Sequence, residues 1–346
     1  MEDTGEKISP IRKMNLIFRF SYTLPFFTAS VCGSLFAFLF YEPSVHIVIL
    51  MPLVVLLLAV FVNFSNDYFD HRSGVDKIRF SEKEEMAKAM ISDSELLKRI
   101  YWEGNPFDND LITEKQGKAV MIVLLLMAGL MAVPIILYGG WAVIAFGAAG
   151  VFLSYFYTAP PLDLGARGLG EIDVALSFFM LVFCSFYVAT IGTGGDVLFT
   201  FILDAAPGVF DTEIFVLAVL IGTLVGLMRL TDSMSGQEAH IANGEKSVSV
   251  RFGLDGTAKI AKAFLVFAYL LVIVMILFNP VFAILFLTLP LAAKAWKIMS
   301  LKEKMWEMRV PPFFFGTAFM TEMLFIVAVI LISVSGIEWP DAFSFL

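Results

Sequence analysis

The sequence is poor in the residues on which most soluble enzymes rely. Charged residues make up only 16% of its 346 residues, and it has three histidines and two cysteines. It contains no Ser/His/Asp or Cys/His arrangement, no Cys-x-x-Cys pair and no glycine-rich phosphate-binding motif. Cys32 and Cys184 both fall inside apolar runs, where cysteine is typically a small packing residue, so they indicate nothing about redox compartment. A serine, cysteine or dithiol centre is therefore not expected.

Apolar residues, by contrast, are abundant. They account for 59% of the chain, and the mean hydropathy of +0.83 is far too high for a soluble domain of this size. Runs long enough to cross about 30 Å of hydrocarbon lie at about 20–40, 45–62, 119–138, 140–158, 172–192, 213–230, 260–278, 280–296 and 313–335. We therefore predict an all-α, polytopic membrane bundle of nine transmembrane helices, forming one domain over residues 1–346. Because residues 1–9 are polar and acidic, we expect no cleaved signal peptide.

Basic and acidic residues are segregated between alternate connections. All 24 lysines and arginines fall in or beside the N-terminal tail and the connections after the second, fourth, sixth and eighth runs. The other connections carry only acids, namely Glu42, Asp196, Asp204, Asp211, Glu213, Glu338 and Asp341. By the positive-inside rule, the N-terminus is expected to be cytoplasmic in a multi-pass cell-membrane protein. The lipid bilayer is an expected partner, and nucleic acid is not.

A polar stretch follows directly on the second apolar run. Four of its side chains share one face of the predicted helix: Asn63, Asn66, Asp67 and Asp70. Such oxygen ligands suit Mg²⁺, which needs few carboxylates when a substrate diphosphate completes its coordination. Gly74 then breaks the helix, which lets Asp76 fold back towards the cluster. The alternative is a solvated helix end with cap and turn residues.

A second acidic stretch follows the sixth run and echoes the first. Asp232 to Glu238 repeats the pattern Asp-x-x-Ser-Gly-x-acid that runs from Asp70 to Asp76. We interpret the echo as a decayed duplication, and a chance match over these few residues is the alternative. The implied parts are halves at about 15–170 and 171–300, a ninth helix at 313–335 and a cytoplasmic loop at 77–118. Each half would bring one acidic cluster to the same cytoplasmic face.

Basic residues accompany the two clusters on the same predicted side: Arg19, Arg167, Arg229, Lys246 and Arg251. Together with the acids they describe a place for Mg²⁺ and a polyanion such as diphosphate, whose departing oxygens metal ions and basic side chains stabilise. Arg19 stands at the start of an apolar run, where it either snorkels to the headgroups, the default behaviour, or turns inward to an anion. Glu322 falls near mid-membrane, where an acid is either a functional group or a protonated bridge between helices.

Two connections carry predictions of their own. Residues 81–102 are predicted to form a short surface helix, inside a loop that is either a lid over a site or a solvated spacer. The apolar patch at 197–203 is too short to cross the membrane and predicts an interfacial segment.

Three motifs together resemble the UbiA superfamily of intramembrane prenyltransferases. They run from Asn66 to Asp70, from Tyr157 through Arg167 to Glu171, and from Lys246 to Gly253. The resemblance covers about residues 15–335 and is closest to members that make menaquinone-type lipids from dihydroxynaphthoate. It implies Mg²⁺-dependent transfer of a polyprenyl group from a polyprenyl diphosphate donor to a lipid-soluble, usually aromatic, quinone-precursor acceptor within the membrane.

The resemblance implies that Asn63, Asn66, Asp67 and Asp70 hold one Mg²⁺, that Asp232 serves a second, and that Tyr157, Arg167 and Lys246 contact the diphosphate. Together with the acids and bases noted above, it gives the following expectations. The expected catalytic residues are Asp67, Asp70 and Asp232. The expected ligands of the two metal ions are Asn63, Asn66, Asp67, Asp70, Asp76, Asp232 and Glu238. The residues expected to contact the diphosphate are Arg19, Asn63, Tyr157, Arg167, Arg229 and Lys246. His240 and Glu322 are further candidates.

The chain departs from the family pattern in the second cluster. Family members usually have an acid four residues after the counterpart of Asp232, where this chain has Gly236. On an unbroken helix His240 would lie on roughly the same side as Asp232, whereas Glu238 would need the helix to bend at Gly236. The departure leaves the second metal site and the acceptor open.

Other functions also stay open at this stage. An ion-coupled transporter would use acids near the midplane, and only Glu322 favours it. Prenyl transfer to a glycerophosphate-type lipid, and a catalytically weak scaffold for a partner enzyme, are both compatible with the sequence. The donor chain length and the oligomeric state are not given by it.

Overall fold

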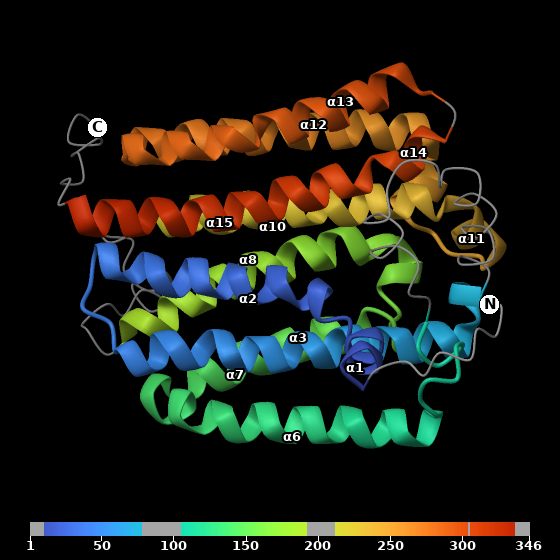
Figure 1. Ribbon diagram of the computed structural model, residues 1–346, viewed down its shortest axis with the longest axis horizontal. Coiled ribbons are helices and arrows are strands. Elements are labelled where there is room, and N and C mark those ends of the chain that lie inside the picture. The colour runs from blue at the N-terminus through green and yellow to red at the C-terminus, as the bar shows by residue number, and fades with distance from the viewer. Residues whose placement is uncertain (1–9, 78–104, 192–211, 304, 336–346) are drawn as a thin grey trace.

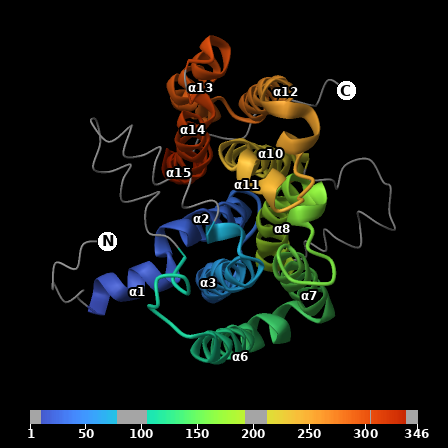
Figure 2. The same cartoon turned by 90° about the vertical axis from the view of Figure 1, so that its right-hand side faces the viewer.

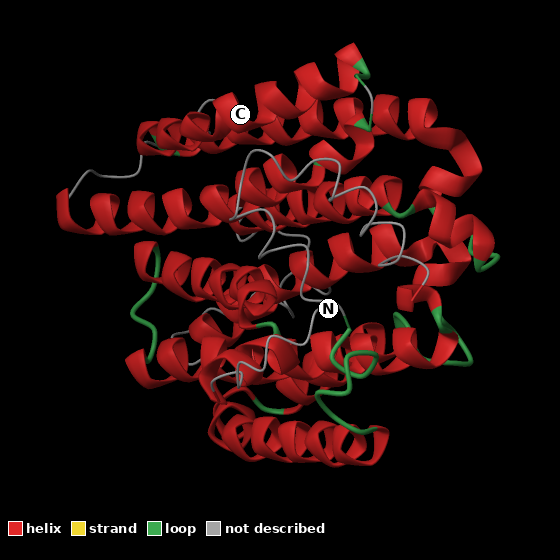
Figure 3. Ribbon diagram, turned by 45° about the vertical axis from the view of Figure 1, so that its right-hand side comes forward, coloured by secondary structure: helices red, strands yellow, loops and turns green. Residues whose placement is uncertain are grey.

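The computed structural model describes residues 10–77, 105–191, 212–303 and 305–335, and the regular structure in these ranges is helical (Figures 1 and 3). The elements in chain order are α1 (Pro10–Phe18), α2 (Phe20–Phe36), η1 (Ala37–Leu39), α3 (Val45–Ser73), α6 (Glu114–Gly139), α7 (Trp141–Phe156), η2 (Gly165–Leu169), α8 (Gly170–Thr190), α10 (Thr212–Ser235), α11 (Gln237–Ala242), α12 (Val248–Phe278), η4 (Pro280–Thr288), α13 (Leu289–Leu301), α14 (Trp306–Arg309) and α15 (Pro311–Ser335). The predicted surface helix at 81–102 and interfacial segment at 197–203 lie outside the described residues.

Each of the nine apolar runs falls in a helix. Within the described ranges, eight helical segments are long and apolar enough to cross a membrane. The remaining run forms α7, which has only 16 residues and is the shorter member of the set. The prediction of an all-α, multi-pass helical bundle is therefore confirmed.

Polar signals outside the apolar runs set several helix ends. α6 begins at Glu114, ahead of its apolar run, because Thr113 and Gln116 form a capping box. α3 ends at Ser73, where Gly74 takes a left-handed conformation with φ of 78°. α10 ends at Ser235, and α11 restarts the chain after Gly236. The helices thus carry polar extensions beyond their membrane-crossing parts.

The long helices lie side by side along one direction (Figure 1). Seen end-on, α3, α6, α7 and α8 gather on one side and α10, α12, α13 and α15 on the other, with α2 near the centre (Figure 2). α2 packs on α3, α8 and α15, and α10 packs on α8, α12 and α15. At the right-hand end in Figure 1, the end of α3 lies on the same side of the molecule as α11 and the start of α8.

Small residues let the central helices approach closely. A Cβ on Gly33 of α2 would lie only 2.1 Å from the carbonyl oxygen of Val182 on α8. At the same interface the hydroxyls of Ser30 and Ser185 are hydrogen-bonded at 2.8 Å. Close packing and interhelical hydrogen bonds hold helices together in lipid, where the hydrophobic effect does not. This interface fixes α2 against α8 and so positions the polar helix ends.

Candidate active site

The first acidic stretch forms the end of α3 and meets an arginine from the start of α2. Arg19 joins α1 to α2 in a left-handed conformation, with φ of 46° and ψ of 52°. Its Nη1 lies 3.0 Å from Oδ1 of Asp67, and the two side chains are 18% and 6% exposed. The expectation that Arg19 snorkels to the headgroups is therefore wrong, because the nearby buried carboxylate draws it inward.

A buried amide ties the chain after α3 back to this carboxylate. Asn105 Nδ2 donates to the backbone oxygen of Asp67 at 2.7 Å and to Oδ2 of Asp76 at 2.8 Å. Asp76 itself is 4% exposed. The left-handed turn at Gly74 thus returns Asp76 to the cluster, as the sequence predicts. Asn105 gave no sequence signal, because it stands 29 residues further along the chain.

The other predicted ligands occupy the same end of α3. Asn66 Oδ1 accepts a hydrogen bond from the hydroxyl of Thr158 at 3.0 Å, and Asp70 is half-buried. Asn63 Nδ2 and Asp67 Oδ2 are both buried without a hydrogen-bond partner. A buried polar atom without a partner is costly in a folded protein unless a ligand supplies one. The orphaned carboxylate oxygen therefore marks a position suited to a ligand.

This donor set fits a cation that takes part of its coordination from a substrate. In the parts of the chain that the structure describes, no three His, Cys, Asp or Glu side chains come together as a metal site. Mg²⁺ does not require such a cage, since it is usually held by one or two carboxylates, waters and substrate phosphates. Asp67 and Asp70, with the neighbouring amides, match that requirement in number and chemistry.

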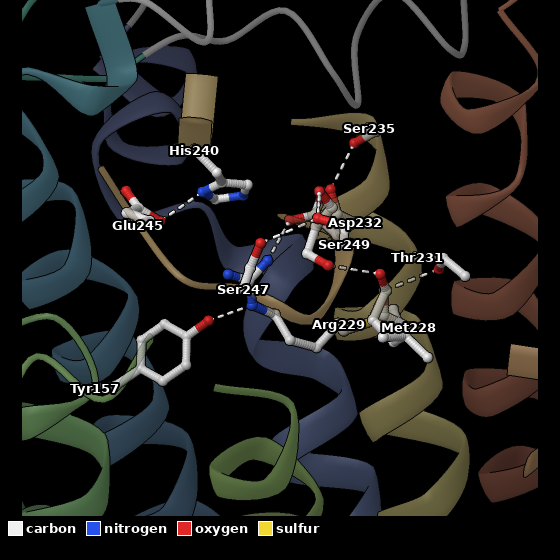
Figure 4. A network of polar contacts seen from close by, with 12 residues as sticks. Tyr157, Met228, Arg229, Thr231, Asp232, Ser235, His240, Glu245, Ser247 and Ser249 are labelled. Atoms are coloured by element: carbon white, nitrogen blue, oxygen red, sulfur yellow. Dashed lines mark hydrogen bonds and ion pairs between the residues drawn. The ribbon is translucent and has the colours of Figure 1, made fainter. Parts of the chain in front are cut away.

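The second cluster is a network between α10 and the turn after α7 (Figure 4). Arg229 Nε donates to the hydroxyl of Tyr157, and Arg229 Nη1 lies 3.2 Å from Oδ2 of Asp232. The phenol of Tyr157 thus accepts a hydrogen bond from the guanidinium group of Arg229. Its contact with Arg229 also argues against a simple membrane-interface belt role for this tyrosine.

Beyond Gly236, the second stretch turns away from Asp232. His240 on α11 is 4% exposed, and its Nδ1 lies 2.5 Å from Oε2 of Glu245 (Figure 4). Glu238 is exposed on the same short helix. Burial acts to raise the pKa of Glu245, but the hydrogen bond and charge of His240 outweigh it and hold the pKa below its ordinary value. The helix break at Gly236 thus lets His240 pair with Glu245. Because the helix is interrupted, His240 does not take the place beside Asp232 that an unbroken helix would give it.

Two consecutive residues connect the clusters. Thr158 bonds Asn66 at the end of α3, and Tyr157 bonds Arg229 on α10. The segment that follows them packs against the start of α12, where Lys246 N donates to the backbone oxygen of Ala166 at 2.7 Å. Both polar helix ends therefore border one region instead of opening onto separate parts of the molecule.

Three basic residues border this region: two that were predicted to contact the diphosphate, and Arg251. Arg167, Lys246 and Arg251 are exposed. Arg167 Nη2 donates to the backbone oxygen of Pro161 at 2.7 Å, and Arg251 Nη2 donates to the backbone oxygen of Arg167 at 2.7 Å. Gly168 allows this packing, because a Cβ there would lie 2.1 Å from the backbone oxygen of Lys246. That Arg167 and Lys246 contact a diphosphate stays a prediction.

Glu322 lies elsewhere, in the interior of the bundle. It is 0% exposed, and its Oε2 accepts a hydrogen bond from Thr28 on α2. The thiol of Cys32 is 3.4 Å from its backbone oxygen. Of the two alternatives for Glu322, the structure matches the bridge between helices, here α15 and α2.

An apolar cavity of about 440 Å³ lies between α3, α6, α7 and α8. Small-molecule sites typically measure about 300–1,000 Å³. Among the described residues, its lining is apolar or glycine apart from the hydroxyls of Ser154 and Ser177 and the thiol of Cys184. Along α3 the lining ends at Val62, directly before Asn63. The cavity therefore runs through the helices towards the polar end of α3.

Sequence reasoning missed several polar residues of this region. Thr158 and Glu245 bond residues that the motifs did single out. Glu171 was singled out only as part of a motif, yet its Oε1 is buried without a partner. Asp173 is 6% exposed and has a buried Oδ1 without a partner. Its place inside an apolar run was the only available signal.

Comparisons with known proteins agree with this architecture. The family model described as the UbiA prenyltransferase family matches residues 26–320. A solved UbiA homolog from Archaeoglobus fulgidus, bound to DMAPP and Mg²⁺, has a TM-score of 0.61 at 16% identity, covering 94% of this chain and 100% of that chain. An apo UbiA homolog from Aeropyrum pernix K1 has a TM-score of 0.55 at 14% identity, covering 91% and 99%.

A further solved structure, of a digeranylgeranylglyceryl phosphate synthase, has a TM-score of 0.50 at 15% identity and covers 92% of this chain and 98% of that chain. A comparison with curated protein sequences finds no match. At such low identities the solved structures show only that the fold is shared, whereas the family model shows which family the chain belongs to. Because that model matches most of the chain, the protein belongs to the UbiA prenyltransferase family.

Proposed function

We propose that the protein transfers a polyprenyl group from its diphosphate to a lipid-soluble aromatic acceptor of the quinone-precursor type, with Mg²⁺ as cofactor. The observation that carries the proposal is the junction at Tyr157 and Thr158, which connects the polar end of α3 to that of α10. A diphosphate lying at this junction would have acids and bases from both helices around it. Family membership supports the reaction class.

The metal would be held at the end of α3. Asp67 and Asp70 would supply carboxylate oxygens, with Asn63, Asn66 and Asp76 close by, and Asp232 would serve a second ion. The unpartnered Oδ2 of Asp67 supports this assignment. A solved homolog from Archaeoglobus fulgidus was bound to Mg²⁺ and DMAPP. When bound, the metal would stabilise negative charge on the diphosphate oxygens.

The bases would hold and stabilise the leaving group. Arg19 and Arg229 each carry a guanidinium fork suited to phosphate oxygens, and each is currently paired with an acid of its cluster. Diphosphate binding would exchange these acids for phosphate oxygens as partners. When the bond between C1 of the prenyl group and the diphosphate oxygen breaks, the electron pair leaves with the oxygen. The neighbouring guanidinium groups, with the neutral hydroxyl of Tyr157, would stabilise that charge.

The apolar cavity would take the donor's hydrocarbon chain. Its walls come from α3, α6, α7 and α8, and its lining ends next to Asn63, where the head group would lie. The described residues that line it carry no charged side chain. Burial of the chain there would keep water from the reacting carbon.

The orientation and internal symmetry of the bundle are part of the proposal. The basic connections would face the cytoplasm, which would put the site at the inner side of the cell membrane. The two polar ends would derive from duplicated halves, at about 15–170 and 171–300. The contacts between the segment at 157–168 and the start of α12 support a shared site between these halves.

The acceptor is tested by product analysis. Membranes containing the protein would be incubated with a polyprenyl diphosphate labelled at C1 and with dihydroxynaphthoate, a phenazine or a glycerophosphate lipid, with and without Mg²⁺. We expect a prenylated aromatic product that requires Mg²⁺ and forms far more slowly with Asp67→Asn. If the only labelled product were a prenylated glycerophosphate lipid, the acceptor would be a glycerophosphate lipid and not an aromatic compound. No labelled lipid product with any acceptor would contradict the proposed function.

A further inference from the structure

Asp173 lies on the face of α8 that lines the apolar cavity. Counting from Asp173, the residues at spacings of four, four, three and four are Ser177, Leu181, Cys184 and Val188, and all four line the cavity. Such spacing places them on one side of a helix. Asp173 therefore continues the cavity wall by one helical turn towards the polar end of the molecule.

The other faces of α8 are taken by neighbouring helices. α2 packs on it through Val182 and Ser185, and a Cβ on Gly222 of α10 would meet the backbone oxygen of Ala175. These positions point away from Asp173 around the helix. The carboxyl group therefore faces the space between α3 and α7, both of which contact α8.

In the described parts of the chain, no side chain forms an ion pair with Asp173. It differs in this respect from Asp67 and Asp232, which both face arginines. The Oδ1 of Asp173 is buried without a hydrogen-bond partner, and the residue is 6% exposed. Asp173 lies in the first turn of α8, where the helix N-terminus favours a negative charge, and a buried polar atom without a partner suits a ligand or a reacting group.

Asp173 stands where the head and the chain of a donor would join. On α7, Ser154 belongs to the cavity, and Thr158, four residues later, bonds Asn66 of the polar cluster. On α8, Ser177 belongs to the cavity, and Asp173 lies four residues earlier. C1 of a prenyl diphosphate is the atom between these two environments. Asp173 is thus level with the atom at which the new bond forms.

We propose that Asp173 accepts the proton that the acceptor loses when it is prenylated. The inference rests on the proposed function. The bond from C1 to the diphosphate oxygen breaks and its electron pair leaves with the oxygen, while a ring carbon of the acceptor that carries hydrogen, or a hydroxyl oxygen, forms a bond to C1. The proton on that acceptor atom passes to a carboxylate oxygen of Asp173, so the charges balance. A carboxylate without a cation or a hydrogen-bond donor has an oxygen open to that proton.

The test separates proton transfer from donor binding. Full-length Asp173→Asn and Asp173→Glu proteins in membranes would be given C1-labelled geranyl diphosphate, with dihydroxynaphthoate as acceptor and a glycerophosphate lipid as the second acceptor. Loss of a general base typically lowers turnover by about 100-fold or more. We expect such a fall in kcat for Asp173→Asn, with donor affinity and acceptor KM within about two-fold of the wild type. Asp173→Glu should recover part of the turnover.

Glu322→Gln serves as a matched control, because it also removes a buried carboxyl group but at the contact between α15 and α2. It should leave kcat and donor affinity unchanged. Full turnover of Asp173→Asn would overturn the assignment, and so would a parallel loss of donor affinity without recovery in Asp173→Glu. If the wild type prenylated neither acceptor, the proposed function itself would fail, which is visible before any variant is compared.

Discussion

The two polar helix ends hold their arginines in different ways. In the first cluster, Arg19 reaches Asp67 from a different helix, at a break in the chain between α1 and α2. In the second, Arg229 and Asp232 stand three residues apart on the same helix. The second pair follows from helical geometry alone, whereas the first exists only when α2 and α3 are packed together. The comparison suggests that the first cluster depends on the fold and the second on local sequence.

Burial differs in the same direction. The side chain of Asp67 is 6% exposed and that of Asp232 is 32% exposed. Interactions with a ligand are stronger where water is excluded. Asp67 should therefore contribute more to catalysis than Asp232, and variants can test this ranking of the two aspartates.

The largest effect is expected at the two aspartates. Asp67→Asn should lower kcat/KM for prenyl transfer by about 1,000-fold and Asp232→Asn by about 100-fold, the range seen when one preorganised charge-stabilising group is lost. Rates would be measured with a C1-labelled donor at saturating Mg²⁺. Thermal unfolding in detergent serves as the control for folding. Equal losses at both positions would contradict the ranking by burial.

Arginine-to-lysine changes come next. Arg229→Lys keeps the charge but loses the fork that contacts both Tyr157 and Asp232. We expect a fall in kcat/KM of about 10- to 100-fold, mostly in donor KM, and about 10-fold for Arg19→Lys, whose contact with Asp67 is a single ion pair. Steady-state kinetics with varied donor concentration would distinguish the two. A larger effect at Arg19 would reverse this part of the comparison.

A cavity variant should act on donor length alone. Gly147 lines the cavity from α7, and a Cβ there would meet open space. Gly147→Leu should lower turnover of a long polyprenyl diphosphate by about 10-fold while sparing dimethylallyl diphosphate, because a pocket discriminates chain length by volume. Ala145→Leu, on an exposed part of α7 outside the cavity, is the matched control. The same loss with both donors would contradict a chain-binding role.

The second acidic stretch should tolerate change at its exposed acid. Glu238 lies on α11 with its side chain in solvent. Glu238→Gln should keep kcat/KM within about two-fold of the wild type, measured beside Asp232→Asn and His240→Ala. A loss as large as that of Asp232→Asn would return Glu238 to the set of metal ligands. If all three variants kept full activity, the second half of the proposed duplication would contribute no acidic cluster to catalysis.

The smallest effect concerns pH. The pKa of Glu245 is held below its ordinary value of 4.5, mainly by His240 against the opposing effect of burial. Its charged form therefore stabilises the folded state above pH 4.5, and this contribution is lost as the pH falls through the lower, folded-state pKa. Glu245→Gln should lower the melting temperature at neutral pH by about 1 °C, with the gap closing in acid. A gap that widened in acid would reverse the sign of this coupling.

The sequence predicted the helices well, because nine apolar runs and alternating charge leave little freedom to a membrane chain. It also predicted the turn at Gly74, since glycine is needed where the backbone turns sharply, whereas it left open whether the helix bends at Gly236. Side-chain contacts between different helices could not be predicted from the sequence. Nothing local to Arg19 favours the inward direction over snorkelling, and Asn105 reaches Asp67 only after the chain has folded back.

Membership of a motif was likewise an incomplete guide to the site. Tyr157 belongs to a motif, but its neighbour Thr158 makes the contact with α3. Asp173 lies in an apolar run whose periodicity could be read only once its cavity-facing side was known. Such residues are defined by what lies opposite them, which a single sequence does not contain.

The short length of α7 has a consequence for how the two products would be released. Its 16 residues rise by about 24 Å, less than the roughly 30 Å of a hydrocarbon layer. Tyr157 and Thr158 would then lie beneath the level of the phospholipid phosphates. The released pyrophosphate, which is highly charged, would have to move several ångströms outward to reach water. The prenylated product is apolar and could diffuse laterally into the lipid bilayer. The anion and the prenylated lipid would therefore leave the site by different routes.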